Sequence, residues 1–225
     1  MKACLFDIDG TLVQTGGAGM YAFAEAFAEL FGVESLSQDI SFAGRSDRAI
    51  AGDLLRLHGV GDTAENWARF CPTYVERLQA QLDRCEGRVL PGCVDLIESL
   101  KQMPEVHLGL LTGNVRAAAE KKLRHYDVWD HFAFGGFGDN HPDRNDIAAD
   151  ARQAALSRHG SPVAEEQIVV IGDTPNDVRC ARSIGAYAVA VCTGGASHAE
   201  LAACAPDLLL ETLEDHDAIL GWLAA

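Results

Sequence analysis

ACLFDIDGTL, residues 3–12, joins a short apolar run to two carboxylates near the start of the chain. An apolar run of this length that ends at a turn predicts a buried strand, and alternate residues of a strand lie on the same face. Asp7 and Asp9 are therefore expected on one face, where they repel each other unless a cation lies between them or they share a proton. Because ligands bind at the carboxyl ends of strands in open parallel sheets, the stretch predicts a strand and a polar site together.

Downstream of residue 85, apolar runs alternate with patterns of helical periodicity. The expected strands are 106–111, 132–135, 168–171, 187–191 and 207–210. The expected helices are one opened by Pro91 and those at 115–126, 146–159 and 175–184. Apolar strands that alternate with helices are typical of a parallel sheet covered on both faces, so the fold class is α/β.

Between residues 16 and 85 the periodicity is helical throughout. It predicts helices at 20–31, 46–57 and 65–82, with Gly32 ending the first and Pro72 kinking or dividing the third. The simplest organisation is an α/β catalytic core of residues 1–15 and 86–225, with residues 16–85 inserted as a helical cap. Met20, Phe23 and Phe27 are expected in the core of that cap and not in contact with substrate.

Composition limits the function classes. The chain has 225 residues, 33 acidic and 18 basic, with a net charge of −15. This acidity argues against nucleic acid and anionic membranes as partners, because phosphate groups are bound by clustered Lys and Arg. The seven cysteines form no C-x-x-C pair, and no apolar stretch approaches the length of a membrane span. With a strand predicted from the first residues, no signal peptide is expected, and the protein is predicted to be cytoplasmic.

Polar residues follow three of the expected strands. Besides the Asp7 and Asp9 pair, Thr112-Gly113-Asn114 follows the strand 106–111, and Gly172-Asp173 with Asp177 follows 168–171. Taken one at a time, these are ordinary turn and helix-cap residues. Brought to one edge of a parallel sheet, carboxylate, hydroxyl and amide groups suit Mg²⁺ and a phosphoryl group.

These motifs resemble those of the haloacid dehalogenase superfamily, in the branch with a small helical cap that includes phosphoglycolate phosphatases and β-phosphoglucomutases. Asp7-x-Asp9-Gly10-Thr11 is similar to its first motif, Thr112-Gly113-Asn114 to its second and Gly172-Asp173-x-x-x-Asp177 to its fourth. The resemblance implies a Rossmann-like sheet of order 5-4-1-2-3. The third-motif Lys is missing, and Arg144 is its best substitute, since a guanidinium can pair with carboxylate and phosphate oxygens. Lys121 and Lys122 are the alternatives, although both look like mid-helix surface residues.

The resemblance also implies roles. Asp7 attacks phosphorus, and Asp9 protonates the leaving oxygen and later takes a proton from water. The remaining phosphoryl contacts are assigned to Thr112, Gly113, Asn114 and Arg144. Mg²⁺ is assigned to Asp7, the Asp9 carbonyl, Asp173 and Asp177.

The cap residues 42–46 resemble a loop that selects the leaving group. Gly44 permits close backbone approach, and Arg45 either faces an anionic or polyhydroxyl leaving group or is simply a residue at a helix start.

The leading functional hypothesis is a Mg²⁺-dependent phosphatase that acts on a small phosphorylated metabolite as a monomer or homodimer. A sugar-phosphate mutase keeps both aspartates and a comparable cap, so the motifs do not separate it from a phosphatase. A haloacid dehalogenase is weakened by Asp9, because halide needs no proton. The resemblance also includes phosphonate hydrolases, which need a Schiff-base Lys in the cap. That function is disfavoured because no Lys occurs between Lys2 and Lys101. A non-catalytic binding module is disfavoured by the complete set of aspartates.

Overall fold

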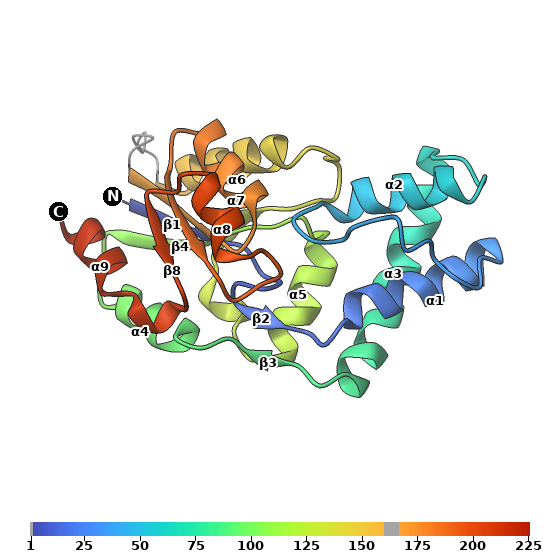
Figure 1. Ribbon diagram of the computed structural model, residues 1–225, viewed down its shortest axis with the longest axis horizontal. Coiled ribbons are helices and arrows are strands. Elements are labelled where there is room, and N and C mark those ends of the chain that lie inside the picture. Colours follow the sequence, from blue (N-terminus) through green and yellow to red (C-terminus); the bar gives the residue numbers. More distant parts are fainter. Residues whose placement is uncertain (1, 160–166) are drawn as a thin grey trace.

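A six-stranded parallel sheet lies at the centre of the larger part of the computed structural model, which describes residues 2–159 and 167–225 (Figure 1). Its order is β5-β4-β1-β6-β7-β8, and every neighbouring pair is parallel. The strands are β1 (Lys2–Phe6), β4 (Val106–Leu111), β5 (Phe134–Gly136), β6 (Ile168–Gly172), β7 (Tyr187–Val191) and β8 (Leu208–Leu210). If β1, β4, β5, β6 and β7 are numbered 1 to 5 in chain order, the sheet read from β7 to β5 has the expected order 5-4-1-2-3. The strand β8 adds a sixth strand beside β7.

The strand β1 is central because its side chains are buried on both faces of the sheet. Cys4 and Phe6 contribute to one hydrophobic cluster, and Ala3 and Leu5 contribute to the other. The register places Leu5 opposite Gly109 of β4 and Val170 of β6. The residues that follow β1 therefore emerge in the middle of the carboxyl edge of the sheet.

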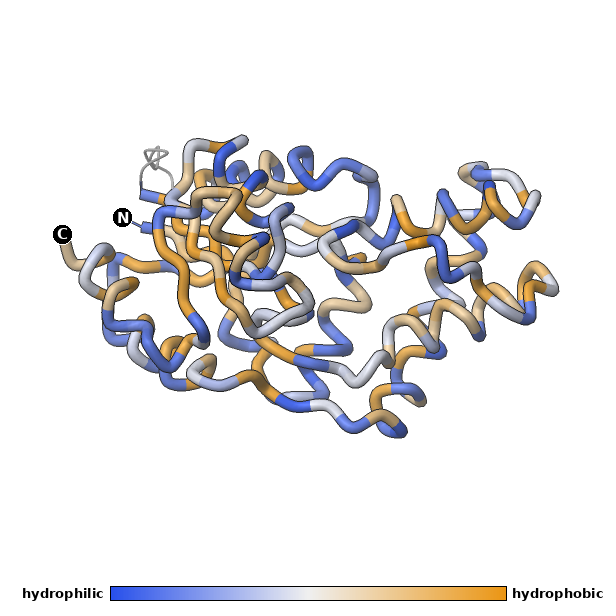
Figure 2. Tube along the Cα trace, in the orientation of Figure 1, coloured by the Kyte–Doolittle hydropathy of each residue, from blue (hydrophilic) through white to orange (hydrophobic). Residues whose placement is uncertain are grey.

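Helices cover both faces, as the alternating sequence predicts. On one face lie α4 (Cys93–Lys101), α5 (Arg116–His125) and α9 (Asp217–Ala224), and on the other lie α6 (Arg144–His159), α7 (Pro175–Ser183) and α8 (His198–Ala203). Short 3-10 turns lie at Trp129–His131 and Leu213–Asp215. Figure 2 shows hydrophobic colour along the central strands. Within residues 2–159 and 167–225, no helix is both long and apolar enough to cross a bilayer.

Three helices form a segment at one end of the molecule (Figure 1), here called the helical segment: α1 (Ala18–Phe31), α2 (Asp47–Leu57) and α3 (Ala64–Arg84). Their buried aromatic residues pack against one another, with the Phe23 ring centroid 4.8 Å from that of Phe70 and 4.5 Å from that of Tyr74. Gly32 ends α1 with a φ of 67°. The helix α3 runs through Pro72 without division, so of the two alternatives, a kinked helix or two helices, the second is wrong.

Two short strands at the base of this segment were not predicted. In β2 (Val13–Gln14) and β3 (Arg88–Val89) the chain leaving for the helical segment pairs antiparallel with the chain returning from it. The helix expected to open at Pro91 begins at Cys93 instead, after Gly92 with a φ of 77°. A Cβ at Gly92 would lie 2.0 Å from the backbone of Leu213, so the chain turns there against the C-terminal region before the helix starts.

We expect Phe23→Ala to lower the free energy of unfolding by about 3–5 kcal/mol, because it removes a ring that is 1 % exposed and contacts three other rings. Met20→Ala, on the same helix at 47 % exposure, is the matched control and should cost less than about 1 kcal/mol. Urea denaturation measures both. Equal losses would contradict the packing described for the helical segment.

Candidate active site

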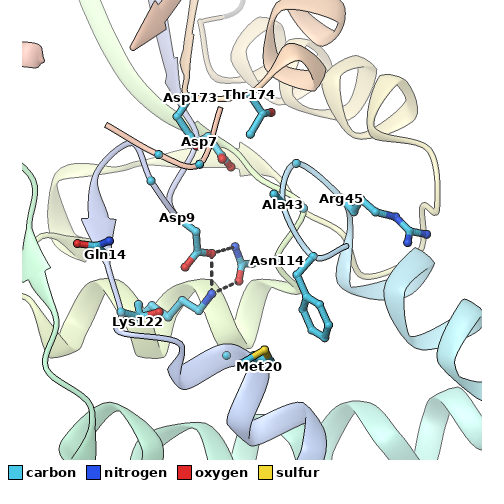
Figure 3. Close-up of a pocket in the computed structure, with 18 of the residues that line it drawn as sticks. Asp7, Asp9, Gln14, Met20, Ala43, Arg45, Asn114, Lys122, Asp173 and Thr174 are labelled. Carbon is cyan, nitrogen blue, oxygen red and sulfur yellow. Dashed lines mark hydrogen bonds and ion pairs between the residues drawn. The ribbon is translucent and has the colours of Figure 1, made fainter. Parts of the chain in front are cut away.

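A cavity of about 470 Å³ lies between the carboxyl edge of the sheet and the helical segment. Asp7 and Asp173 line it from the sheet, and Phe23, Ile50 and Tyr74 line it from the helices. Met20 also lines this cavity and is half exposed, so its expected place in the core of the helical segment is wrong (Figure 3).

Three buried carboxylates meet at the floor of the cavity. Oxygens of Asp7, Asp173 and Asp177 all lie within 4.8 Å of one another. Asp7 follows β1, Asp173 follows β6, and Asp177 is in the first turn of α7. The adjacency of β1 and β6 brings together residues that are 166 or more positions apart in the sequence.

The surroundings of Asp173 fix its carboxylate. Thr11 Oγ1 donates to Asp173 Oδ1 at 3.0 Å. A Cβ on Gly10 or Gly194 would lie 2.5 or 1.6 Å from Asp173 Oδ2, so both positions leave room for this carboxylate only as glycine.

Asp177 has little bonding capacity left. Its Oδ2 accepts from the backbone N–H and the hydroxyl of Thr174, at 2.9 and 2.6 Å, in a capping box at the start of α7. Its Oδ1 accepts from Arg144 at 2.5 Å. Asp177 thus holds the helix start and the guanidinium at the same time.

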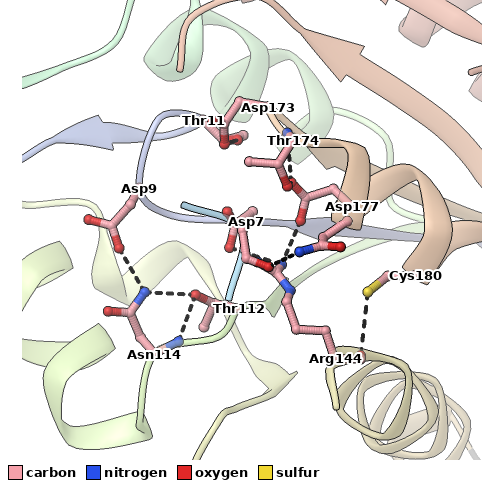
Figure 4. A network of polar contacts seen from close by, with 12 residues as sticks. Asp7, Asp9, Thr11, Thr112, Asn114, Arg144, Asp173, Thr174, Asp177 and Cys180 are labelled. Carbon is pink, nitrogen blue, oxygen red and sulfur yellow. Dashed lines mark hydrogen bonds and ion pairs between the residues drawn. The ribbon is translucent and has the colours of Figure 1, made fainter. Parts of the chain in front are cut away.

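Arg144 is the cation of this cluster (Figure 4). It lies at the first position of α6, is 7 % exposed, and its Nη2 lies 2.5 Å from Asp177 and 3.4 Å from Asp7. The candidates for the missing third-motif Lys were Arg144 and, as alternatives, Lys121 and Lys122. The structure brings Arg144 to the carboxylates of Asp7 and Asp177.

The cluster carries more negative than positive charge. Burial raises the pKa of Asp7 to about 7, against the lowering effect of Arg144, while Asp177 and Asp9 raise it further. Burial also raises the pKa of Asp173 well above its usual range, with added repulsion from Asp177 and Asp7. Among the described residues, one guanidinium faces three buried carboxylates. A hard divalent cation with oxygen ligands fits this donor set, because it would offset the remaining charge.

Asp9 turns away from the cluster toward a second polar group (Figures 3 and 4). Its Oδ2 accepts from Asn114 Nδ2 at 2.8 Å and from Lys122 Nζ at 2.6 Å. Asn114 Oδ1 accepts from Lys122 at 2.7 Å, and Thr112 Oγ1 accepts from both the backbone and side-chain nitrogens of Asn114.

The interpretation of Lys122 as a surface residue is wrong. Lys122 is 4 % exposed and lines the cavity, whereas Lys121 beside it donates to the carbonyl of Val75 in α3. A sequence signal existed: Lys122 lies four and three residues after Ala118 and Ala119, which places it on the apolar face of the expected helix.

The segment at residues 42–47 contacts two core loops and the start of α7. Asn176 donates to the Gly44 carbonyl, Ser46 Oγ donates to the Pro142 carbonyl at 3.0 Å, and the N–H of Asp47 donates to the Gly113 carbonyl at 2.7 Å. Gly113 must be glycine here, because a Cβ would lie 2.1 Å from the Arg45 carbonyl oxygen.

Arg45 lines the cavity, but its guanidinium points away from the aspartates (Figure 3). That guanidinium pairs with Asp53 of α2. The two interpretations of Arg45, a contact to the leaving group and a residue at a helix start, both stay predictions. Asp47 was not anticipated: it lines the cavity, accepts from the Val115 N–H at 2.8 Å, and burial raises its pKa to about 7 despite the charge of Lys122.

Comparisons with known proteins show which proteins this chain is similar to. A family model described as haloacid dehalogenase-like hydrolase matches residues 4–182. A phosphoglycolate phosphatase from Synechococcus elongatus is 31% identical over 222 residues, covering 96% of this chain and 95% of its own. The structure of CbbY from Rhodobacter sphaeroides in complex with phosphate has a TM-score of 0.76 at 26% identity and covers 96% of each chain. A putative β-phosphoglucomutase from Thermotoga maritima shares the fold, with a TM-score of 0.63 at 23% identity over 98% of this chain and 99% of its own.

We expect Asp7→Asn to stabilise the EDTA-treated protein in a pH-dependent way. An acid whose pKa rises from 3.8 to about 7 on folding binds its proton more tightly in the native state, so it weakens stability as pH increases through that interval. Replacing it with a neutral side chain should raise Tm by several degrees at pH 8 and have progressively less effect toward pH 4.

Calorimetry of both proteins across this range is the measurement. A Tm difference between wild type and Asp7→Asn that stays constant from pH 4 to 8 would show that Asp7 titrates normally.

Proposed function

The chain belongs to the haloacid dehalogenase-like hydrolase family and is a phosphoric monoester hydrolase, and from that premise we propose that it is a Mg²⁺-dependent phosphatase for a small phosphorylated metabolite, acting through an aspartyl phosphate. The observation that carries the proposal is the juxtaposition of Asp7 with two further buried carboxylates and Arg144 in one cavity.

Asp7 is the proposed nucleophile. Its Oδ1 contacts Arg144, while burial excludes the water that would otherwise solvate the carboxylate. We assign Mg²⁺ to Asp7 and Asp173, the Asp9 carbonyl and, through water, Asp177, whose carboxylate oxygens already accept hydrogen bonds. The ion supplies neutralisation of the phosphoryl charge. Most of the rate enhancement then comes from positioning and charge stabilisation.

Thr112 and Gly113 are the proposed phosphoryl contacts of the second motif. Thr112 Oγ1 accepts two hydrogen bonds from Asn114, so its own hydrogen is free to donate to a phosphoryl oxygen. The backbone N–H of Asn114 is engaged by that hydroxyl, which leaves the Gly113 N–H as the amide donor of the loop.

Asp9 is the proposed acid and base. It lines the same cavity as Asp7 but lies outside the carboxylate cluster, so the two aspartates have different surroundings. In the first step Asp9 donates a proton to the leaving oxygen as the phosphorus–oxygen bond breaks. In the second step Asp9 takes a proton from the water that hydrolyses the phosphoryl–Asp7 bond.

We further propose that residues 16–85 act as a cap over the substrate, that the enzyme works as a monomer or homodimer in the cytoplasm, and that nucleic acid and membranes are not its partners. The seven cysteines, all free, are consistent with a reducing compartment. Gly44 and Arg45 line the cavity and are the proposed substrate contacts of residues 16–85, with Arg45 paired to Asp53.

A sugar-phosphate mutase remains the second candidate, since the likeness to a putative β-phosphoglucomutase shows the shared fold alone and the aspartates serve either reaction. A haloacid dehalogenase is disfavoured by Asp9, which halide release does not need.

The deciding experiment measures phosphate release from a panel of small phosphate esters with Mg²⁺, beside EDTA and beside Asp7→Asn. We expect turnover that both controls abolish, because the first removes the cation and the second removes the nucleophile. Turnover that survives in Asp7→Asn would contradict the aspartyl-phosphate route. No net release from any ester, followed by turnover with a sugar bisphosphate primer, would favour the mutase.

Arg144 can be tested with a matched pair of variants. Arg144→Met should lower kcat by about 100-fold or more, because it removes the guanidinium that contacts Asp7 and Asp177. Arg144→Lys, which restores the residue type expected for the third motif, should stay within about tenfold of wild type. Steady-state kinetics on the best ester measures both, and equal losses in the two variants would show that charge alone is not what Arg144 contributes.

A further inference from the structure

Lys122 is a buried cation that the proposed phosphatase mechanism leaves without a role. Its side chain is 5 % exposed, and its Nζ lies 2.6 Å from Asp9 Oδ2 and 2.7 Å from Asn114 Oδ1. A buried ammonium requires hydrogen-bonding partners, because water is not available to solvate it. These two acceptors therefore hold Lys122 in place, and Lys122 in turn holds them.

The helical segment closes over this lysine. A Cβ on Gly19 of α1 would lie 3.5 Å from Lys122 Nζ and 4.0 Å from the hydroxyl of Tyr74 in α3. Asp47 at the start of α2 is near enough for the lysine charge to lower its pKa against the effect of burial. Lys122 thus extends from a core helix into the place where the helical segment meets Asp9.

Lys122 fixes the orientation of Asn114. An ammonium can only donate, so the amide oxygen must face Lys122 and the amide nitrogen must face Asp9 and Thr112. Asn114 then supplies the second hydrogen bond to the oxygen of Asp9 that Lys122 already contacts.

The contacts with Lys122 and Asn114 make the two carboxylate oxygens of Asp9 different in their hydrogen bonding. Oδ2 accepts from both Lys122 and Asn114, whereas Oδ1 has no hydrogen-bond partner among residues 2–159 and 167–225. The side chain is 41 % exposed and lines the cavity, so without these two donors it would be free to rotate. A proton on Asp9 belongs on Oδ1, because Oδ2 already receives two donors.

We propose that Lys122 is a positioning residue for the reaction: it fixes the Asp9 carboxylate so that Oδ1 exchanges its proton with the leaving-group oxygen. The proposal rests on the phosphatase function. As Asp7 bonds to phosphorus and the ester bond breaks, the Oδ1 proton moves to the leaving oxygen. As water attacks phosphorus and the phosphoryl–Asp7 bond breaks, a proton of that water returns to Oδ1.

The test compares two esters that differ in their need for an acid. An alkyl phosphate, the best of the panel, needs protonation of its leaving oxygen, and p-nitrophenyl phosphate does not. Lys122→Met should lower kcat for the alkyl ester by about 100-fold and for p-nitrophenyl phosphate by less than about fivefold, with KM little changed.

Lys121→Met is the matched control. Lys121 is the adjacent residue of the same helix and also contacts the helical segment, but its partner is the Val75 carbonyl and not Asp9. We expect it to keep both activities within about threefold of wild type. The same ester-selective loss in Lys121→Met would overturn the role assigned to Lys122.

A double variant tests whether Lys122 acts through Asp9. Asp9→Asn combined with Lys122→Met should be no slower on the alkyl ester than Asp9→Asn alone. The proposal would be overturned if the loss of kcat in the double variant equalled the product of the losses in the two single variants. It would also be overturned if Lys122→Met lost the same factor of kcat on both esters. Lys122→Gln, which keeps a donor on a shorter side chain, replaces Lys122→Met if that variant does not fold, and the same selective loss is expected.

Failure of the function and failure of this inference differ in the wild-type enzyme. If the wild-type enzyme cleaves neither ester, or if Asp7→Asn cleaves both esters as fast as the wild-type enzyme, the phosphatase function and the role of Lys122 are both contradicted. Wild type that cleaves both through Asp7, with a non-selective loss in Lys122→Met, contradicts only the role of Lys122.

Discussion

Electrostatic repulsion among Asp7, Asp173 and Asp177 is the constraint on which the site depends. Three carboxylates removed from water at the end of a buried sheet are unfavourable unless cations offset them. Arg144 offsets part of this charge, while burial, and after it repulsion from the neighbouring aspartates, raises the pKa values of Asp7 and Asp173. This imbalance destabilises the cluster by itself, and a bound divalent cation would relieve it.

Two buried cations divide the polar residues into two groups. Arg144 contacts Asp7 and Asp177, and Lys122 contacts Asp9 and Asn114. Asp7 and Asp9 are only two residues apart, yet their side chains have different partners and different degrees of exposure. That separation suits a reaction in which one carboxylate attacks phosphorus while the other exchanges protons with the leaving group.

The helical segment completes the site from the opposite side. Its segment at residues 42–47 forms hydrogen bonds with the loops that contain Gly113 and Pro142 and with Asn176 at the start of α7, which lie in the regions of the second, third and fourth motifs. Gly19 of α1 lies close to both Lys122 and the Tyr74 hydroxyl. The short antiparallel pair of β2 and β3 joins the two connections at the base of the segment. The environment of Asp9 therefore depends on contacts from both parts of the chain.

The sequence by itself determined the α/β alternation, the strand that precedes Asp7 and Asp9, and the polar residues that follow the strands at the sheet edge, because strand and helix periodicity and the parallel arrangement are local or nearly local patterns. Only the tertiary structure decided which cation serves which carboxylate. Arg144 was a candidate from its place before a helix, Lys122 was assigned to the surface, and Arg45 was left between two interpretations. The direction of a long charged side chain depends on carboxylates far away in the sequence and on the burial that forces it to pair, and neither is visible until the chain has folded.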